Sequence, residues 1–296
     1  MKGTVVFKYL PPALAEGLSG LGISVKRPVV GAQQGLHRSP NHGASVEFAE
    51  YREYRPGDPP NMIDWAVYGR SDRYMIRRFQ EETNLRGHVL LDTSESLGFR
   101  AAGPMSKLEY ACHLAASMLF ILVRQGDTAG LMTFDETVRE GFAPVGTFEG
   151  LRPMLMHLEG VQAGGGSGIE ASLHEAAARL KSRSLVILIS DLLQPADGIL
   201  RGLRHLQHDG HDVTVFQVLD PGEIELGLAG LSEVSELETG RRLLIDADEI
   251  RESYRRAVER HLDALRSGCS QSMVDYLQVS TRMSVEEAVH LRARRA

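Results

Sequence analysis

Cysteine and long apolar runs are scarce in this chain, and each scarcity excludes a class of protein. Cys112 and Cys269 are the only cysteines among 296 residues, which excludes a disulfide framework and a cysteine metal cluster and favours a reducing compartment. No segment approaches the roughly 20 apolar residues that span a bilayer. Pro11 and Pro12 interrupt the N-terminal apolar residues that a signal peptide would need. We therefore expect a cytoplasmic protein without a membrane span.

The chain also lacks an excess of basic residues. Its formal net charge is -6, whereas a domain that binds nucleic acid through bulk charge is usually strongly basic. We expect no nucleic-acid partner. The histidines show neither H-E-x-x-H nor Cys-His spacing, so the sequence predicts no zinc site. A hydrophobic content of 43% with 24% charged residues is typical of a globular protein.

From Arg86 onward, short apolar runs alternate with segments of helical periodicity. This alternation predicts an α/β fold with a doubly wound, mostly parallel sheet covered by helices on both faces. The run at 185–189 is apolar throughout, which suits a strand buried on both sides. Ser106 and Glu109 predict a capping box at the start of one helix. The expected strands cover 87–91, 128–134, 138–142, 185–189, 213–219, 242–245 and 276–279, and the expected helices cover 107–125, 148–158, 169–180, 198–208, 248–266 and a segment from 285.

The first part of the chain has a different character. It is rich in glycine and proline, with turn-forming residues at 40–43 and 55–60. We predict an N-terminal extension of short strands and loops over residues 1–83, packed on an α/β domain over residues 84–296.

Three polar residues follow the first expected strand at alternate positions. Asp92, Ser94 and Ser96 come directly after the apolar run at 87–91, at the end of a strand where open α/β sheets bind their ligands. One carboxylate and two hydroxyls are hard oxygen donors, which suit Mg²⁺ or Mn²⁺ better than Zn²⁺. A structural alternative is that Ser94 or Ser96 caps the following turn.

Two more segments should reach the same edge of the sheet. Asp191 follows the strand at 185–189, and the glycine-rich segment 164–168 can turn tightly before a helix and bring Ser167 close. The predicted metal ligands are Asp92, Ser94, Ser96, Ser167 and Asp191. A cation held by these groups keeps one position open for an Asp or Glu of another protein.

This combination resembles the metal-ion-dependent adhesion site of von Willebrand factor A-type domains. The resemblance implies direct metal contact by Asp92, Ser94 and Ser96 and by the hydroxyl of the glycine-rich loop, with Asp191 acting through water. Ser167 stands where the family usually has threonine. The hydroxyl is kept and the methyl group is lost, which bears on the rigidity of the loop and on metal affinity.

A second resemblance rests on a segment dense in arginine and carboxylates upstream of the first strand. The matching residues are Arg52, Tyr54, Asp58, Asp64, Trp65 and Arg70, together with residues 78–82. They resemble the signature of the bacterial domain-of-unknown-function 58 family, which lies just upstream of a von Willebrand-like strand. The resemblance is to the soluble members of that family. It implies a MoxR-type AAA+ ATPase as partner, for which this protein would be an adaptor or chaperone-like component. It implies no enzymatic activity.

The signature segment has two interpretations. The first is an arginine–carboxylate network in which a buried Trp65 fixes the N-terminal region to the sheet domain. The second is a docking surface for a partner, since tryptophan and arginine are favoured anchors at interfaces.

Two functions from different classes fit the metal motif. One is a non-enzymatic interaction module that grips an acidic residue of a partner through the metal. The alternative is a Mg²⁺-dependent phosphatase or hydrolase with Asp92 as the nucleophile. Haloacid-dehalogenase-type phosphatases use Asp-x-Asp, whereas here Ser94 stands at the second position and cannot serve as the general acid. We therefore expect a protein that is not an enzyme.

Overall fold

The computed structural model describes residues 6–23, 47–55, 58, 60, 63–80, 85–235 and 242–294. The chain divides into two compact units. We call them the sheet unit, Met1–Pro28 with Leu85–Ala296, and the small unit, Val29–Asn84. Within the described ranges, no helix combines the length and apolar character needed to cross a bilayer.

The division between the units falls next to residue 84, and it differs from the expected 1–83 extension at the N-terminus. Residues up to Pro28 belong with the sheet unit. Leu18 is fully buried there, and the Gln125 side chain donates to Ile23 O (2.8 Å) and accepts from Ile23 N (2.9 Å). The short helix α1, Pro12–Gly17, packs in this segment near α3. Burial of a few apolar side chains ties this segment to the sheet unit.

A six-stranded sheet forms the centre of the sheet unit, in the order β10-β7-β6-β3-β4-β5. Neighbouring strands are parallel except β5, which runs antiparallel to β4 at one edge. The predicted doubly wound, mostly parallel α/β fold is confirmed. The strands are β3 (Arg86–Asp92), β4 (Thr128–Phe134), β5 (Val138–Val145), β6 (Leu185–Ser190), β7 (Asp212–Leu219) and β10 (Asp275–Ser280).

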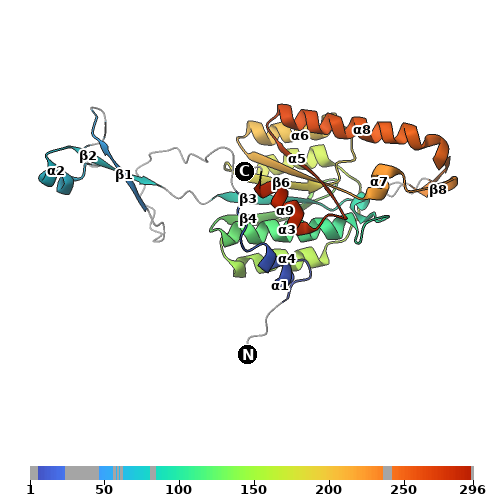
Figure 1. Ribbon diagram of the computed structural model, residues 1–296, viewed down its shortest axis with the longest axis horizontal. Coiled ribbons are helices and arrows are strands. Elements are labelled where there is room, and N and C mark those ends of the chain that lie inside the picture. Colours follow the sequence, from blue (N-terminus) through green and yellow to red (C-terminus); the bar gives the residue numbers. More distant parts are fainter. Residues whose placement is uncertain are drawn as a thin grey trace. The chain divides into compact units, whose positions relative to one another are not determined.

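Helices cover both faces of this sheet, as Figure 1 shows. One face carries α3 (Lys107–Arg124), α4 (Phe148–Gly160) and α9 (Val285–Ala293). The other carries α5 (Ile169–Arg179), α6 (Ala196–His208) and α8 (Ala247–Gln271). The capping box predicted from Ser106 and Glu109 is present at the start of α3.

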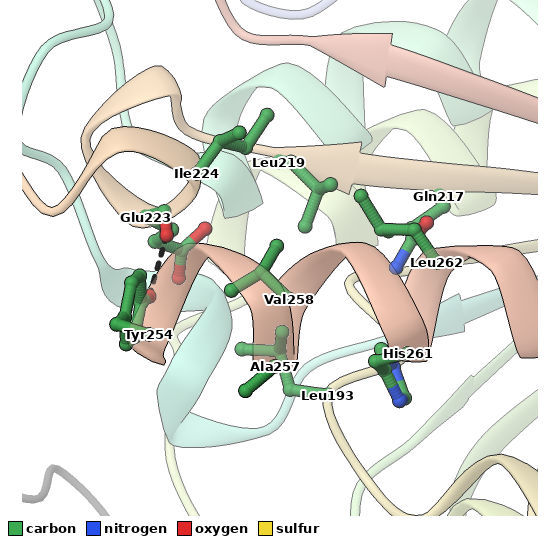
Figure 2. A pocket seen from close by; sticks show the side chains of 10 residues that line it. All are labelled: Leu193, Gln217, Leu219, Glu223, Ile224, Tyr254, Ala257, Val258, His261 and Leu262. Carbon is green, nitrogen blue, oxygen red and sulfur yellow. Dashed lines mark hydrogen bonds between the residues drawn. The ribbon is translucent and has the colours of Figure 1, made fainter. Parts of the chain in front are cut away.

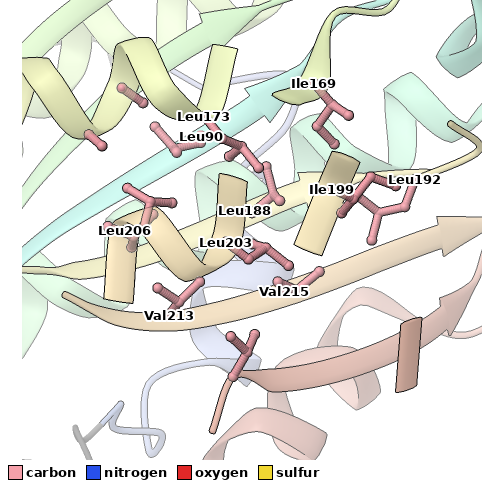
Figure 3. Packing of buried hydrophobic residues seen from close by; sticks show 14 of the residues in the cluster. Leu90, Ile169, Leu173, Leu188, Leu192, Ile199, Leu203, Leu206, Val213 and Val215 are labelled. Carbon is pink, nitrogen blue, oxygen red and sulfur yellow. The ribbon is translucent and has the colours of Figure 1, made fainter. Parts of the chain in front are cut away.

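The apolar character of the strands explains this layering. Every residue of β6 is buried, because helices cover both faces of the sheet. On the α5–α6 side, Leu188 of β6 and Val215 of β7 pack against Leu173 of α5 and Leu203 of α6 (Figure 3). Such burial of aliphatic side chains stabilises the fold by roughly 1.5–3 kcal/mol per side chain.

Smaller elements complete the two units. After β7 the chain forms the short helix α7 (Pro221–Glu225) and an antiparallel pair, β8 (Leu231–Ser235) with β9 (Arg242–Asp246), outside the main sheet. In the small unit, β1 (Glu47–Glu53) pairs antiparallel with β2 (Met75–Gln80), and α2 (Trp65–Ser71) lies between them in the sequence.

Candidate metal site

Asp92 and Asp191 meet at one edge of the sheet because their strands are neighbours. Asp92 is the last residue of β3, and Asp191 directly follows β6. The two strands are parallel, with Leu91 opposite Ile189. The predicted convergence of the two carboxylates at the carboxyl edge is therefore found, and both residues are almost fully buried, at 1% and 2% exposed.

Both carboxylate oxygens of Asp92 accept hydrogen bonds. Oδ1 accepts from the backbone N–H of Ser94 (2.9 Å) and Oδ2 from the Ser190 hydroxyl (2.6 Å). Burial, together with the negative charge of Asp191, raises the pKa of Asp92 to about 7, although the bonds from Ser190 and Ser94 oppose this rise. The carboxylate of Asp92 has no cationic partner among these hydrogen bonds, which is a condition that favours a bound cation.

Ser94 and Ser96 present their hydroxyls side by side. The two Oγ atoms are 3.2 Å apart, at the start of a short 3-10 helix, η2 (Glu95–Gly98). Oxygens about 2.1 Å from one Mg²⁺ in an octahedral shell lie about 3 Å from each other, so this spacing fits two neighbouring ligands. The Ser94 side chain makes no capping hydrogen bond to η2, so the structural alternative of a helix cap does not explain it.

The glycine-rich loop lies against the Asp92–Ser96 segment through two backbone hydrogen bonds. Gly164 N donates to Thr93 O (3.0 Å), and Glu95 N donates to Gly165 O (3.1 Å). Gly165 has a φ of +78°, and a Cβ there would lie 2.9 Å from Asp135 Oδ2. Because residue 165 is glycine, the loop can adopt this φ and lie this close to Asp135.

Ser167 follows two residues after Gly165 in the same loop, and its backbone is held by a side chain that comes after β6. The Gln194 side-chain amide donates to the Ser167 backbone oxygen. Among the described residues, the Ser167 hydroxyl makes no hydrogen bond. The donor set of carboxylates and hydroxyls fits a hard divalent cation.

A buried lysine, absent from the sequence-based prediction, occupies the other side of Asp191. Lys107 Nζ donates to Asp191 Oδ2 (2.8 Å) and to Glu223 Oε1 (2.5 Å). Burial raises the pKa of Glu223, against the pull of the Lys107 charge. One signal in the sequence points to Lys107: it is the first residue of α3, where the helix dipole disfavours a cation.

A cavity of about 260 Å³ lies beside this ion cluster (Figure 2). Gln217 of its wall donates to the backbone oxygen of Asp191 (2.9 Å), and His261 lies with Nε2 2.7 Å from Leu192 O. Most of the lining is apolar and comes from β7, α7 and α8. The lining residues are Leu193, Gln217, Leu219, Glu223, Ile224, Tyr254, Ala257, Val258, His261 and Leu262.

The signature residues lie in the small unit, and one expectation about them is wrong. The Trp65 side chain is 60% exposed rather than buried. It starts α2 and packs edge-to-face on Tyr68 and Tyr74, whose rings stack with centroids 4.5 Å apart. The aromatic rings cover one another at the surface of the unit, so Trp65 is stabilised without burial.

The charged signature residues have separate structural partners. Arg52 pairs with Asp58 (2.8 Å), and the Arg52 bond lowers the pKa of Asp58. Asp64, 4% exposed, caps α2 by accepting from Ala66 N and Val67 N, and it accepts the Tyr51 hydroxyl (3.0 Å). The other two signature residues also have partners within the small unit: Tyr54 N donates to Tyr74 O, and Arg70 Nε donates to Ala66 O. The residues 78–82 have no described side chains.

The model of one protein family, "Protein of unknown function DUF58", matches residues 50–264. The chain therefore belongs to this family. It is 28% identical over 272 residues to the uncharacterized protein Rv1480 of Mycobacterium tuberculosis (strain ATCC 25618 / H37Rv), covering 89% of this chain and 84% of that one. The uncharacterized protein Mb1516 of Mycobacterium bovis matches with the same values.

Two solved structures are similar in part. BatB from Bacteroides thetaiotaomicron superposes with a TM-score of 0.47 and 15% identity, covering 72% of this chain and 98% of that chain. The vWF domain of the type V pili tip protein Mfa5 from Porphyromonas gingivalis gives a TM-score of 0.39 and 12% identity, covering 72% and 94%.

Proposed function

We propose that the sheet unit is a non-enzymatic interaction module that binds Mg²⁺ or Mn²⁺ and grips an acidic residue of a partner protein through the metal. The ligands are Asp92, Ser94, Ser96, Ser167 and, through water, Asp191. One observation carries the proposal: two buried carboxylates meet at a strand edge beside two hydroxyls whose oxygens are 3.2 Å apart. Such a set offers oxygen ligands and negative charge at one point.

The charge of this set favours a protein carboxylate as the last ligand. Burial excludes the water that would otherwise screen the cation, and two carboxylates with neutral hydroxyls leave its field partly uncompensated. A carboxylate from outside supplies both a ligand and the missing charge. Ser96 and Ser167 are only partly buried, so they mark the side from which a partner approaches.

The proposed partner is a MoxR-type AAA+ ATPase, with this protein as an adaptor or chaperone-like component. Support comes from what the resemblance of the signature residues implies, since those residues lie within the matched family segment, residues 50–264. We place the encounter in the cytoplasm, because both cysteines are free and buried in the protein interior, which suits a reducing compartment.

The test is a Mg²⁺-dependent binding measurement with a purified MoxR-type ATPase from the same organism. We expect binding by the wild-type chain with Mg²⁺, and loss of binding with EDTA or in Asp92→Ala. Equal binding in all three conditions contradicts the proposed metal contact. A phosphatase screen with Mg²⁺ tests the non-enzymatic part: turnover that disappears in Asp92→Asn would establish the alternative.

A further inference from the structure

Lys107 is a fully buried cation within the candidate metal site. Its ammonium contacts one carboxylate oxygen of Asp191 and one of Glu223, and the three side chains are 0%, 3% and 14% exposed. The Phe99 ring covers a further side, with its centroid 5.6 Å from Nζ. Burial of an ammonium costs several kcal/mol unless it is paired, so these two carboxylates hold Lys107 in place.

The position of Lys107 in the chain works against its burial. It is the first residue of α3, where the partial positive charge of the helix end repels a cation. A lysine at the start of a helix can usually extend its ammonium into water. Here it points inward to a carboxylate of the candidate metal site, and this direction needs an explanation beyond packing.

We propose that Lys107 is a built-in competitor of the divalent cation for Asp191. In the metal-free protein its ammonium neutralises Asp191, and a bound cation must share this carboxylate with it or displace it. The inference rests on the function proposed above, since it concerns the same site. Its consequence is regulatory: the isolated protein binds metal weakly, and a partner carboxylate restores the negative charge that Lys107 cancels.

Glu223 provides the place to which the ammonium can move. Its Oε2 accepts from Asp220 N (3.1 Å) in the capping box of α7, and the Tyr254 hydroxyl donates to its backbone oxygen (2.5 Å). The carboxylate is therefore fixed independently of Asp191. When Asp191 turns to a metal-bound water, Lys107 keeps Glu223 as its partner, so the exchange leaves no buried charge unpaired.

Three variants separate this competition from an effect of net charge. Lys107→Met removes the competitor, and Glu223→Gln leaves Asp191 as the sole carboxylate for the ammonium. The double variant Lys107→Met with Glu223→Gln keeps the formal charge of the wild type but frees Asp191. Lys181→Met is the matched control. Lys181 is exposed and lies before the amino end of β6, whereas Asp191 follows its carboxyl end. Circular dichroism checks that each chain is folded, and calorimetry with Mg²⁺ and with Mn²⁺ gives the dissociation constants.

We expect Lys107→Met to tighten metal binding about tenfold or more, the size typical of changes next to metal ligands, and Glu223→Gln to weaken it. The double variant should bind more tightly than the wild type, and Lys181→Met should match the wild type. If the double variant equals the wild type while the single variants differ, affinity follows net charge and the competition is refuted. If Lys107→Met does not fold, the double variant and Glu223→Gln decide.

The same titrations distinguish failure of the competition from failure of the proposed function. Metal binding by the wild type with no change in any variant overturns the competition and leaves the metal site standing. Binding that appears only when Lys107 is removed supports the competition. Absence of binding in every folded variant, including those without Lys107, overturns both.

Discussion

The Ser190 hydroxyl donates a 2.6 Å hydrogen bond to Asp92 Oδ2, joining β6 to β3 at the point where the candidate metal site begins. Both side chains are buried. The same Ser190 oxygen accepts from Leu192 N (3.1 Å). This single hydroxyl thus orients the first carboxylate and fixes the backbone just after Asp191.

Ser190→Ala should lower the free energy of unfolding by about 2 kcal/mol at pH 8, because a hydrogen bond to a charged, buried group is lost. Urea unfolding followed by circular dichroism measures the change. Ser184→Ala is the control: Ser184 is also buried and directly precedes β6, but among the described residues its hydroxyl donates to Ser182 O alone. A loss in Ser190→Ala no larger than in the control would contradict the role given to Ser190.

Asp92→Asn should stabilise the metal-free protein at pH 8, by about 2 kcal/mol. The folded pKa of Asp92, about 7, lies above the ordinary aspartate value of 3.8. The wild type therefore loses stability as the pH rises from about 4 to 7, where the buried carboxyl ionises, and the Asn variant does not. Urea midpoints at pH 5 and pH 8 test this: the advantage of the variant must grow with pH, and an advantage that shrinks would refute the assignment.

His88 should make the fold sensitive to mild acid. Burial lowers the pKa of His88 from 6.5 to about 4, with smaller effects of His211 and Arg86. The unfolded chain takes up this proton near pH 6.5 and the folded chain only near pH 4. The free energy of unfolding is therefore highest above pH 6.5. It falls by about 3 kcal/mol as the pH drops from 6.5 to 4. His88→Gln should show a shallower decline of the urea midpoint between pH 7 and 5. The same slope in variant and wild type would count against this burial effect.

Asp64→Ala should loosen the small unit alone. The variant loses the N-cap of α2, which contributes about 1 kcal/mol, and the partner of the Tyr51 hydroxyl. Hydrogen exchange should speed up roughly tenfold in residues 63–76, with no change in β3 or β6. Glu53→Ala, an exposed position in β1, serves as the control. Equal acceleration in both variants would show that the cap is unimportant.

Most of the sheet unit could be predicted because its signals are local. Apolar runs such as 185–189 and the helical period of 107–125 depend only on neighbours in sequence. Asp92 and Asp191 were found in the same way, since each directly follows a strand and parallel strands share an edge. The pairing of β8 with β9 lacks such runs, because the side chains of these two strands are exposed or only partly buried.

The rest of the site depends on contacts between distant segments. Lys107 and Glu223 are 116 positions apart, and Ser190 and Asp92 are 98 positions apart. Ser190 looks ordinary as a strand end, and the single local signal at Lys107 is its place at the start of a helix. Trp65 shows the opposite case: its residue type favours burial, whereas edge-to-face packing on Tyr68 and Tyr74 holds it at the surface of its unit.

The most direct test of the central claim is calorimetric titration of Mg²⁺ and Mn²⁺, up to millimolar concentrations, into the full chain and into Asp92→Ala. Hydrogen exchange on the same samples confirms that the variant keeps β3 and β6. We predict that the wild-type chain binds the cation and that the folded Asp92→Ala chain does not. Equal binding by both chains would contradict the site.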